Sequence, residues 1–318
     1  MTPPALALPR TYWAGCGLVI AGGLMLSLGI LCLRAASASD AWQYLFWRGI
    51  GFTVTLTALA ARRHAASPLA QIRRLGGFAW VSVLALVASQ VFFVAAIKAG
   101  NTAEVFFLLS LAPLMAAILA RPLLGERIGV MSLIAIGVGL GGVALMSGLG
   151  FEAASIGWAT HAPSPWLPRV LALGAAVSFA LYSLATRGAR TQDLDAALAT
   201  VGIVTSLLCA VALVWLGLPL APRLGDVALA LLHGGVVLAL GLVLFARGSR
   251  VVPGLTLVML AQAETVAAPI WTYLVFHETT TPAVIGGGAL ILSAVLIEAS
   301  EQARHRRGAA AVNARLTP

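Results

Sequence analysis

Long runs of apolar residues, separated by short stretches that carry charges, Pro or Gly, follow one another along the whole chain. The runs show no alternation of polar and apolar positions, so they predict helices and not the strands of a barrel. Each run is about 20 residues long, which is the length that a helix needs to cross the bilayer core. Ten spans are expected, at 12–33, 41–61, 76–98, 102–120, 129–148, 168–187, 195–217, 226–247, 253–276 and 281–300.

The composition points to an all-α integral membrane protein. Of the 318 residues, 60% are apolar and only 10% are charged, whereas soluble domains carry about 25% charged residues. The net charge of +9 does not indicate nucleic acid, because Lys98 is the only lysine and the arginines are scattered at segment ends. Cys16, Cys32 and Cys209 lie in apolar segments without C-x-x-C spacing, so we expect no disulfide, no metal and no cofactor.

The cationic residues are distributed unevenly between alternate loops. With the N-terminus inside, fifteen of the 20 fall on the cytoplasmic side and four on the other. Under the positive-inside rule, this split places both termini in the cytoplasm of a multi-pass inner-membrane protein. The expected parts are a cytoplasmic N-terminus (1–11), a first five-helix repeat (12–148), an external connecting loop (149–167), a second, inverted repeat (168–300) and a basic, disordered cytoplasmic tail (301–318).

The chain has the pattern of two similar halves. Glu126 in "LLGERI" and Glu278 in "VFHETT" are 152 residues apart, and a shift by this number superimposes the first five spans on the last five without a gap. Few residues are identical under the shift, so the repeat is inferred from the superposition of the apolar runs. Because each half has an odd number of spans, the second half must be inserted upside down. Inverted repeats around a central cavity are typical of transporters, since two such halves can open one site to each side in turn.

Several motifs resemble those of the EamA-type drug/metabolite transporter superfamily. They are "NTAEVFFLLSLAPLMAAILARPLLGERIGVMSLIAIGVGLGGVALM" (101–146), "AETVAAPIWTYLVFHE" (263–278), "TPAVIGGGALILSAVLI" (281–297) and "LFWRG" (45–49). The resemblance implies ten helices, movement of small metabolites, and a cavity lined by the third, fourth, eighth and ninth spans with help from the first and sixth. The sequence departs from the family at Thr265, where Pro is usual, at His277, where Gly is usual, and at Glu104, where Asn or a small residue is commoner.

Glu264 is the main candidate for a functional side chain. It lies eleven residues after Pro253, about 16 Å into the ninth span at 1.5 Å per residue and therefore close to the bilayer midplane. An acid at that depth costs several kcal/mol, of the order of 3, unless it is paired, protonated or in contact with water. Glu264 is therefore either a structural hydrogen-bonding group or part of a transport site, where it could carry a proton or bind a substrate amine.

Other polar side chains inside the spans are weaker candidates. Gln90 and His233 lie on the third and eighth spans, and each could bind substrate or make a structural hydrogen bond between helices. Gln262 lies about 200° around the helix from Glu264, which favours a role in joining helices. Ser110 and Tyr182 are candidate lining residues on the fourth and sixth spans.

Four charged residues near span ends are expected to be structural. Arg48 and Glu104 fall on the same predicted side, which allows an ion pair between them, while the alternative for Glu104 is that it only stabilises a helix N-terminus. Glu126 and Glu278 follow directly after helices in the repeated motif, which favours a role in fixing loops over ligand binding.

Proline and glycine mark two further features of the spans. Pro113 and Pro269 each remove a backbone hydrogen bond, which either frees a carbonyl group to line a site or only kinks the helix. The run "GVGLGG" (137–142) lacks the strand and turn of a dinucleotide site, so we expect Gly137 and Gly141 to form a close-packing face.

The motif inventory favours transport over catalysis. The sequence contains no G-x-x-x-x-G-K-[ST], no H-E-x-x-H and no G-x-S-x-G. We expect a secondary active transporter that exports small metabolites, such as amino acids or amines, by alternating access, with proton coupling as one option. The alternatives are an integral membrane enzyme and a scaffold that does not transport. The expected partners are a small-molecule substrate and membrane lipid but no nucleic acid, and a homodimer is left open.

Overall fold

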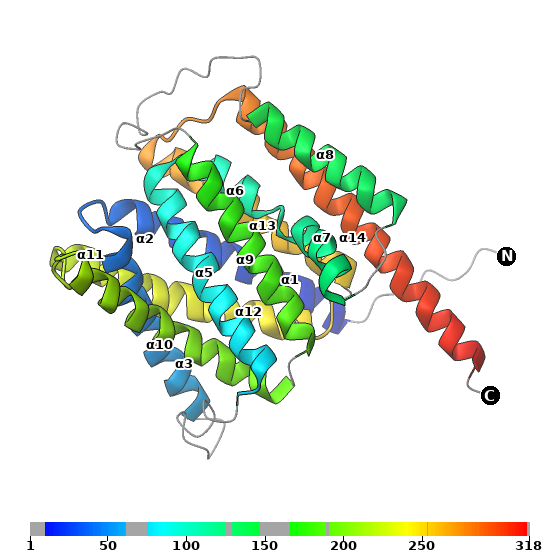
Figure 1. The fold of residues 1–318 in the computed structure, drawn as a ribbon, viewed down its shortest axis with the longest axis horizontal. Coiled ribbons are helices and arrows are strands. Elements are labelled where there is room, and N and C mark those ends of the chain that lie inside the picture. Colours follow the sequence, from blue (N-terminus) through cyan, green and yellow to red (C-terminus); the bar gives the residue numbers. More distant parts are fainter. Residues whose placement is uncertain are drawn as a thin grey trace.

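The computed structural model describes residues 10–61, 75–124, 129–146, 166–188, 191–252 and 254–316, and these residues form helices and connections without a strand. Figure 1 shows the helices as one bundle. The helices are α1 (Arg10–Ser27), α2 (Gly29–Ala35), α3 (Ala41–Ala61), α5 (Gly77–Ala99), α6 (Thr102–Leu109), α7 (Ala112–Leu124), α8 (Val130–Met146), α9 (Leu167–Gly188), α10 (Thr191–Trp215), α11 (Leu224–Leu232), the π-helix η1 (His233–Leu238), α12 (Ala239–Ser249), α13 (Gly254–Phe276) and α14 (Pro282–Leu316).

Helix occupies every one of the predicted apolar ranges within the described residues. By length and composition, seven helical stretches in this part of the chain can cross a membrane. Two further apolar helices, Val130–Met146 and Thr200–Trp215, are shorter than that test requires. The structure is therefore that of a helical integral membrane protein, and the number of ten crossings stays a prediction.

Three of the predicted spans contain a break or an irregular turn. The first bends at Leu28, whose N–H contacts both the Leu24 and Met25 carbonyl groups at 3.3 and 3.2 Å. The fourth is divided into α6 and α7, because Pro113 has no N–H for the Leu109 carbonyl and its ring would clash with that group. The eighth widens into the π-helix that begins at His233. The ninth, α13, continues through Pro269 without interruption.

The helices pack in pairs that are far apart in sequence. α5 lies along α9, α3 along α10, α8 along α14, and α1 along both α12 and α13. α8 and α14 form one edge of the bundle in Figure 1. The close-packing face of α8 differs from the expected one: a Cβ on Gly142 would lie 2.6 Å from the Gly287 oxygen, whereas Gly137 and Gly141 have nothing within 4 Å among the described residues.

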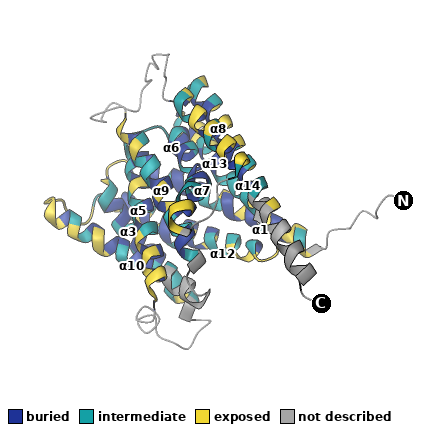
Figure 2. Cartoon of the chain, turned by 45° about the vertical axis from the view of Figure 1, so that its right-hand side comes forward, coloured by how far each residue is buried: buried dark blue, intermediate teal, exposed yellow. Residues whose placement is uncertain are grey.

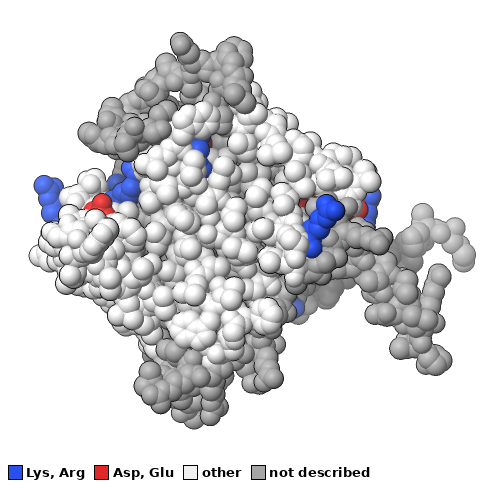
Figure 3. All heavy atoms as spheres, in the orientation of Figure 1, with Lys and Arg blue, Asp and Glu red and all other residues white. Residues whose placement is uncertain are grey.

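The apolar residues that remain exposed give the bundle the surface of a membrane protein. Large apolar side chains such as Val214 and Trp215 are 76% and 85% exposed, and exposed positions lie along the outer faces of the helices in Figure 2. On the face drawn in Figure 3, the broad central area of described atoms is uncharged and the charged side chains lie toward its margins. Such a surface suits hydrocarbon and not water.

The last helix extends beyond its predicted end. α14 continues to Leu316, through residues that we expected to be disordered. Residues 301–316 are rich in Ala and Arg, which are strong helix formers, and they follow a helix that is already formed. The expectation of disorder was therefore wrong for this part of the tail.

Candidate functional site

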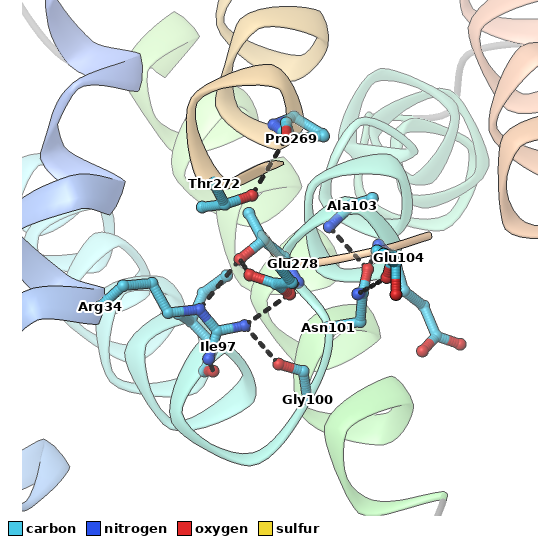
Figure 4. A network of polar contacts seen from close by, with 11 residues as sticks. Arg34, Ile97, Gly100, Asn101, Ala103, Glu104, Pro269, Thr272 and Glu278 are labelled. Atoms are coloured by element: carbon cyan, nitrogen blue, oxygen red, sulfur yellow. Dashed lines mark hydrogen bonds and ion pairs between the residues drawn. The ribbon is translucent and has the colours of Figure 1, made fainter. Parts of the chain in front are cut away.

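An ion pair between Arg34 and Glu278 lies at one end of the bundle, which we call the Glu278 end. Arg34 Nη2 is 2.9 Å from Glu278 Oε1, and the two side chains are 12% and 5% exposed. The same guanidinium donates to the carbonyl groups of Ile97 at 2.7 Å and Gly100 at 2.6 Å. Figure 4 shows Arg34 and Glu278 pointing toward one another between α2 and the end of α13.

Glu278 also receives the first turn of α6. The Thr102 N–H donates to Glu278 Oε1 at 2.6 Å, and the Thr102 hydroxyl donates to Oε2 at 2.9 Å. The same hydroxyl oxygen accepts from Arg34 Nε at 3.1 Å. Because a helix N-terminus carries free N–H groups and partial positive charge, a carboxylate there is favourable. Glu278 therefore joins α2, α6 and the segment that follows α13.

Asn101 and Glu104 complete this end of the bundle. Asn101 Oδ1 accepts from the backbone N–H groups of Ala103 and Glu104, and its Nδ2 donates to the Thr279 carbonyl at 3.1 Å. Glu104 forms an ion pair with Arg169 at the start of α9. The pair considered between Arg48 and Glu104 does not form, because α9 brings Arg169 to Glu104 instead.

Arg48 makes its contact deeper in the bundle. This residue is only 4% exposed, and its guanidinium donates to Gln90 Oε1 on α5. Gln90 is the one hydrogen-bond partner of Arg48 within the described residues. The amide that was a candidate for substrate binding thus holds a buried charge.

His233 pairs with a tyrosine that the sequence did not single out. The Tyr44 hydroxyl lies 2.7 Å from His233 Nδ1, and the two residues are 0% and 5% exposed. A Cβ on Gly29 would come within 2.3 Å of His233 Nε2, so α2 packs directly on the other side of the ring. His233 is therefore enclosed by protein in this structure.

Lys98 lies next to Tyr44. Its ammonium donates to the carbonyl groups of Ala36 and Ser39 and lies 5.7 Å from the centre of the Tyr44 ring. The carbonyl groups belong to the chain that follows α2, so the only lysine of the sequence binds the end of that helix. Cations at a helix C-terminus are favourable in the field of the helix dipole.

Glu264 faces the interior of the bundle. Val266, Ile270 and Tyr273, which are 47%, 50% and 57% exposed, lie about 200°, 240° and 180° around α13 from Glu264 at about 100° per residue. Its own side of the helix carries Ala268 and Trp271, which pack in the largest apolar cluster. Glu264 is nevertheless partly exposed, and it has no hydrogen-bond or ion-pair partner within the described residues.

The remaining polar candidates make few contacts. Gln262 Oε1 is buried and has no partner in the described part of the chain, so the expected bond between helices is not formed by that atom. The Ser110 hydroxyl donates to the Phe107 carbonyl at 2.7 Å within its own helix. Tyr182 is partly exposed, and its ring contacts Phe179.

The two prolines occupy different positions in their helices. Pro113 lies in the first turn of α7 and so marks a complete break. Pro269 lies inside α13, and its carbonyl group accepts from the Thr272 hydroxyl at 3.1 Å. Glu126 lies outside the described residues.

Sequence reasoning missed the partners that surround the candidates. Arg34 and Thr102 at Glu278, and Tyr44 at His233, lie at the ends of helices or among apolar neighbours, where a single sequence gives no sign of a distant contact. The bond from Trp271 Nε1–H to Ser27 Oγ, 2.9 Å long, was also not expected. It links the side of α13 that carries Glu264 to the break in the first span.

Comparison with known proteins agrees with this architecture. A solved crystal structure is similar in fold over 89% of this chain and 97% of its own, with 19% sequence identity and a TM-score of 0.60. At this identity the likeness shows the fold alone. No curated protein matches the chain in sequence. Residues 13–148 match the EamA-like transporter family, a range that nearly coincides with the first predicted repeat. Over these residues, which include nearly all of the first predicted repeat of this multi-pass membrane protein, the chain matches the EamA-like transporter family, part of the drug/metabolite transporter superfamily.

Proposed function

We propose that the protein is a secondary active transporter that exports small metabolites, such as amino acids or amines, across the cytoplasmic membrane by alternating access. Glu264 is the central group of this proposal and carries it. An acid inside a bilayer is stable only when it is paired, protonated or hydrated. Glu264 is partly exposed on the inward side of α13 and has no partner within the described residues, so water or a substrate cation is its expected neighbour.

The irregular helices support a binding region at this level. Leu28, Ser110 and His233 lie seven, eight and nine residues from the Glu278 ends of their spans, or about 10 to 14 Å at 1.5 Å per residue. The segments that carry them are packed together, since α2 contacts both η1 and α13, and α6 contacts α13. Transporters bind substrates and ions where helices are discontinuous near the midplane.

The helix contacts also support two related halves. A shift of 152 residues converts the pairing of α5 with α9 into the pairing of α12 with α1, and it returns the α3–α10 and α8–α14 pairings to themselves. The halves run in opposite directions in this scheme. The first span ends near Arg34 at the Glu278 end, whereas its counterpart α9 begins with Arg169 at the same end. This is the arrangement that alternating access requires.

The charges give the proposed orientation. The Glu278 end faces outside in this proposal, because the predicted cytoplasmic segments hold fifteen of the 20 cationic residues. The carboxyl group of Glu264 would then exchange its bound proton or amine with the cytoplasm in one conformer and with the outside in the other. A carboxyl group in such a place can bind a proton or the ammonium of an amine.

A metabolite-resolved transport screen in proteoliposomes tests the proposal. The screen compares wild type, Glu264→Gln, and Glu301→Gln as a matched loss of an acid near the end of the last span. We expect at least one metabolite to be moved by wild type and by Glu301→Gln but not by Glu264→Gln. Equal uptake of the substrate by Glu264→Gln at every pH would remove Glu264 from the mechanism, and no transported solute at all would favour a scaffold.

A further inference from the structure

The inward side of α13 is buried between Glu264 and the Glu278 end. Toward the Glu278 end, Ala267, Ala268 and Thr272 are buried, at 7%, 0% and 1% exposure. In the other direction, Ala261 and Glu264 on the same side of the helix are partly exposed. A buried stretch from Ala267 to Thr272 therefore separates Glu264 from the Glu278 end, beyond which Val275 is again 53% exposed.

The two parts of the broken fourth span contact different helices. At the Glu278 end, α13 packs against α2 and α6. Beyond the break in the fourth span, α7 packs mainly on α9 and α14. The two parts of the broken span thus have different neighbours, and α13 also packs along α1, whose Gly23 lies beside Ala263.

A small set of polar bonds joins the two halves of the chain at the Glu278 end. Arg34 and Thr102, both from the first half, bind the carboxylate of Glu278 from the second half. Asn101 adds a bond to the Thr279 carbonyl. In Figure 4, Arg34, Asn101 and Glu278 converge where α2, the start of α6 and the end of α13 meet.

We propose that the Arg34–Thr102–Glu278 cluster is a gate that closes the Glu278 end and opens during each transport cycle. This inference rests on the proposed function, since a gate presupposes that the interior opens to both sides. Burial of an ion pair costs desolvation energy that nearly cancels its attraction. When the end opens, water replaces each lost bond, so the closed and open states can be close in free energy, as a two-state gate requires.

The pair between Glu104 and Arg169 lies at the same end but differs in one respect. It links α6 to α9, and α9 also packs against α7, so the two parts of the fourth span both stay against α9. Loss of this pair removes a similar charge interaction without releasing α13. Arg169→Gln is therefore the matched control for Arg34→Gln.

Thiol labelling of a reporter cysteine tests the gate. The native residues Cys16, Cys32 and Cys209 are replaced by alanine, and Ala261→Cys is labelled with a membrane-impermeant maleimide from each side of oriented vesicles, without substrate. With the gate intact, we expect labelling at least tenfold faster from the side opposite Glu278. Glu278→Gln and Arg34→Gln should each raise the rate from the Glu278 side several-fold and lower the rate from the other side.

Opposite changes on the two sides separate a gate from general loosening of the fold. Equal increases from both sides, unchanged rates in both variants, or the same shift in Arg169→Gln would overturn the proposal. Thr102→Val, which removes one hydroxyl and no charge, should give a smaller shift in the same direction. If the side preference reverses but no solute is transported, the gate stands and the proposed function fails. If a solute is transported and the preference does not change, the gate fails alone.

Discussion

The hydroxyl of Tyr44 on α3 and Nδ1 of His233 at the start of the π-helix lie 2.7 Å apart, and protein encloses both groups. This bond connects the second span to the point at which the eighth loses regular α-helical geometry. A π-turn leaves backbone groups displaced from their usual partners, so it persists where the surrounding contacts fix it. Tyr44 is one such contact.

Tyr44→Phe should lower the free energy of unfolding by about 1 to 3 kcal/mol, because His233 Nδ1 would be left buried without a partner. Denaturant unfolding in detergent measures the change. Tyr182→Phe is the matched control, since no hydrogen bond of its hydroxyl occurs within the described residues, and we expect it to stay within about 0.5 kcal/mol of wild type. Equal effects of the two substitutions would contradict a structural role for the Tyr44 bond.

Gln90→Leu should destabilise the protein by at least about 2 kcal/mol, because the Arg48 guanidinium would lose its one partner in the described part of the chain while remaining buried. Gln262→Leu makes the same change where the amide oxygen is already buried without a partner. We expect that variant to be neutral or more stable than wild type. Thermal unfolding of both variants under one condition gives the comparison, and a greater loss for Gln262→Leu would refute this assignment.

The helices could be predicted from hydropathy, whereas their contacts could not. The predicted spans 41–61 and 253–276 match α3 at Ala41–Ala61 and α13 at Gly254–Phe276, because about 20 apolar residues in a bilayer have few alternatives to helix. The break at Pro113 also follows from local chemistry. The breaks at Leu28 and His233 carry no such signal, and the packing of Gly29 on the His233 ring beside both of them joins residues that are far apart in the sequence.

The ion pairs show the same limit of a single sequence. Glu278 was expected near the end of a helix, but nothing local distinguishes Arg34 from Arg48 as its partner. Helix depth and rotation decide the outcome: Arg48 lies at the level of Gln90, and α9 places Arg169 at Glu104. Only Glu264 could be selected as a functional candidate from the free-energy cost of its position, because an isolated acid in the middle of an apolar segment is unfavourable unless it has a role there.

The packing of α8 predicts a contrast between two neighbouring glycines. A Cβ on Gly142 would lie 2.6 Å from the Gly287 carbonyl oxygen, which is backbone and cannot easily move. Gly142→Ala should therefore cost about 1 to 3 kcal/mol, as overpacked substitutions do. Gly141→Ala meets open space in the described structure and should be neutral or stabilising by up to about 1 kcal/mol through helix propensity. Melting temperatures that fall equally in both variants would contradict this packing.

His277→Gly should stabilise the protein. His277 has a φ angle of 54°, a left-handed conformation at the end of α13 that glycine adopts without strain. Relief of the strain, less the greater entropy of glycine in the unfolded chain, gives an expected gain of up to about 1 kcal/mol. His277→Ala keeps the strain and should give no gain. A lower melting temperature for His277→Gly than for His277→Ala would show that the histidine side chain contributes a favourable contact.

The central claim is that Glu264 faces water inside the bundle, and the reactivity of a cysteine at this position tests it most directly. Glu264→Cys, in a chain whose three native cysteines are replaced by alanine, is exposed in vesicles to a charged, membrane-impermeant maleimide and separately to a lipid-soluble one. We predict that the charged reagent reacts from at least one side of the membrane, and that Val266→Cys on the outer face of α13 reacts only with the lipid-soluble reagent. Reaction of Glu264→Cys with the lipid-soluble reagent alone, or with neither, would contradict the account.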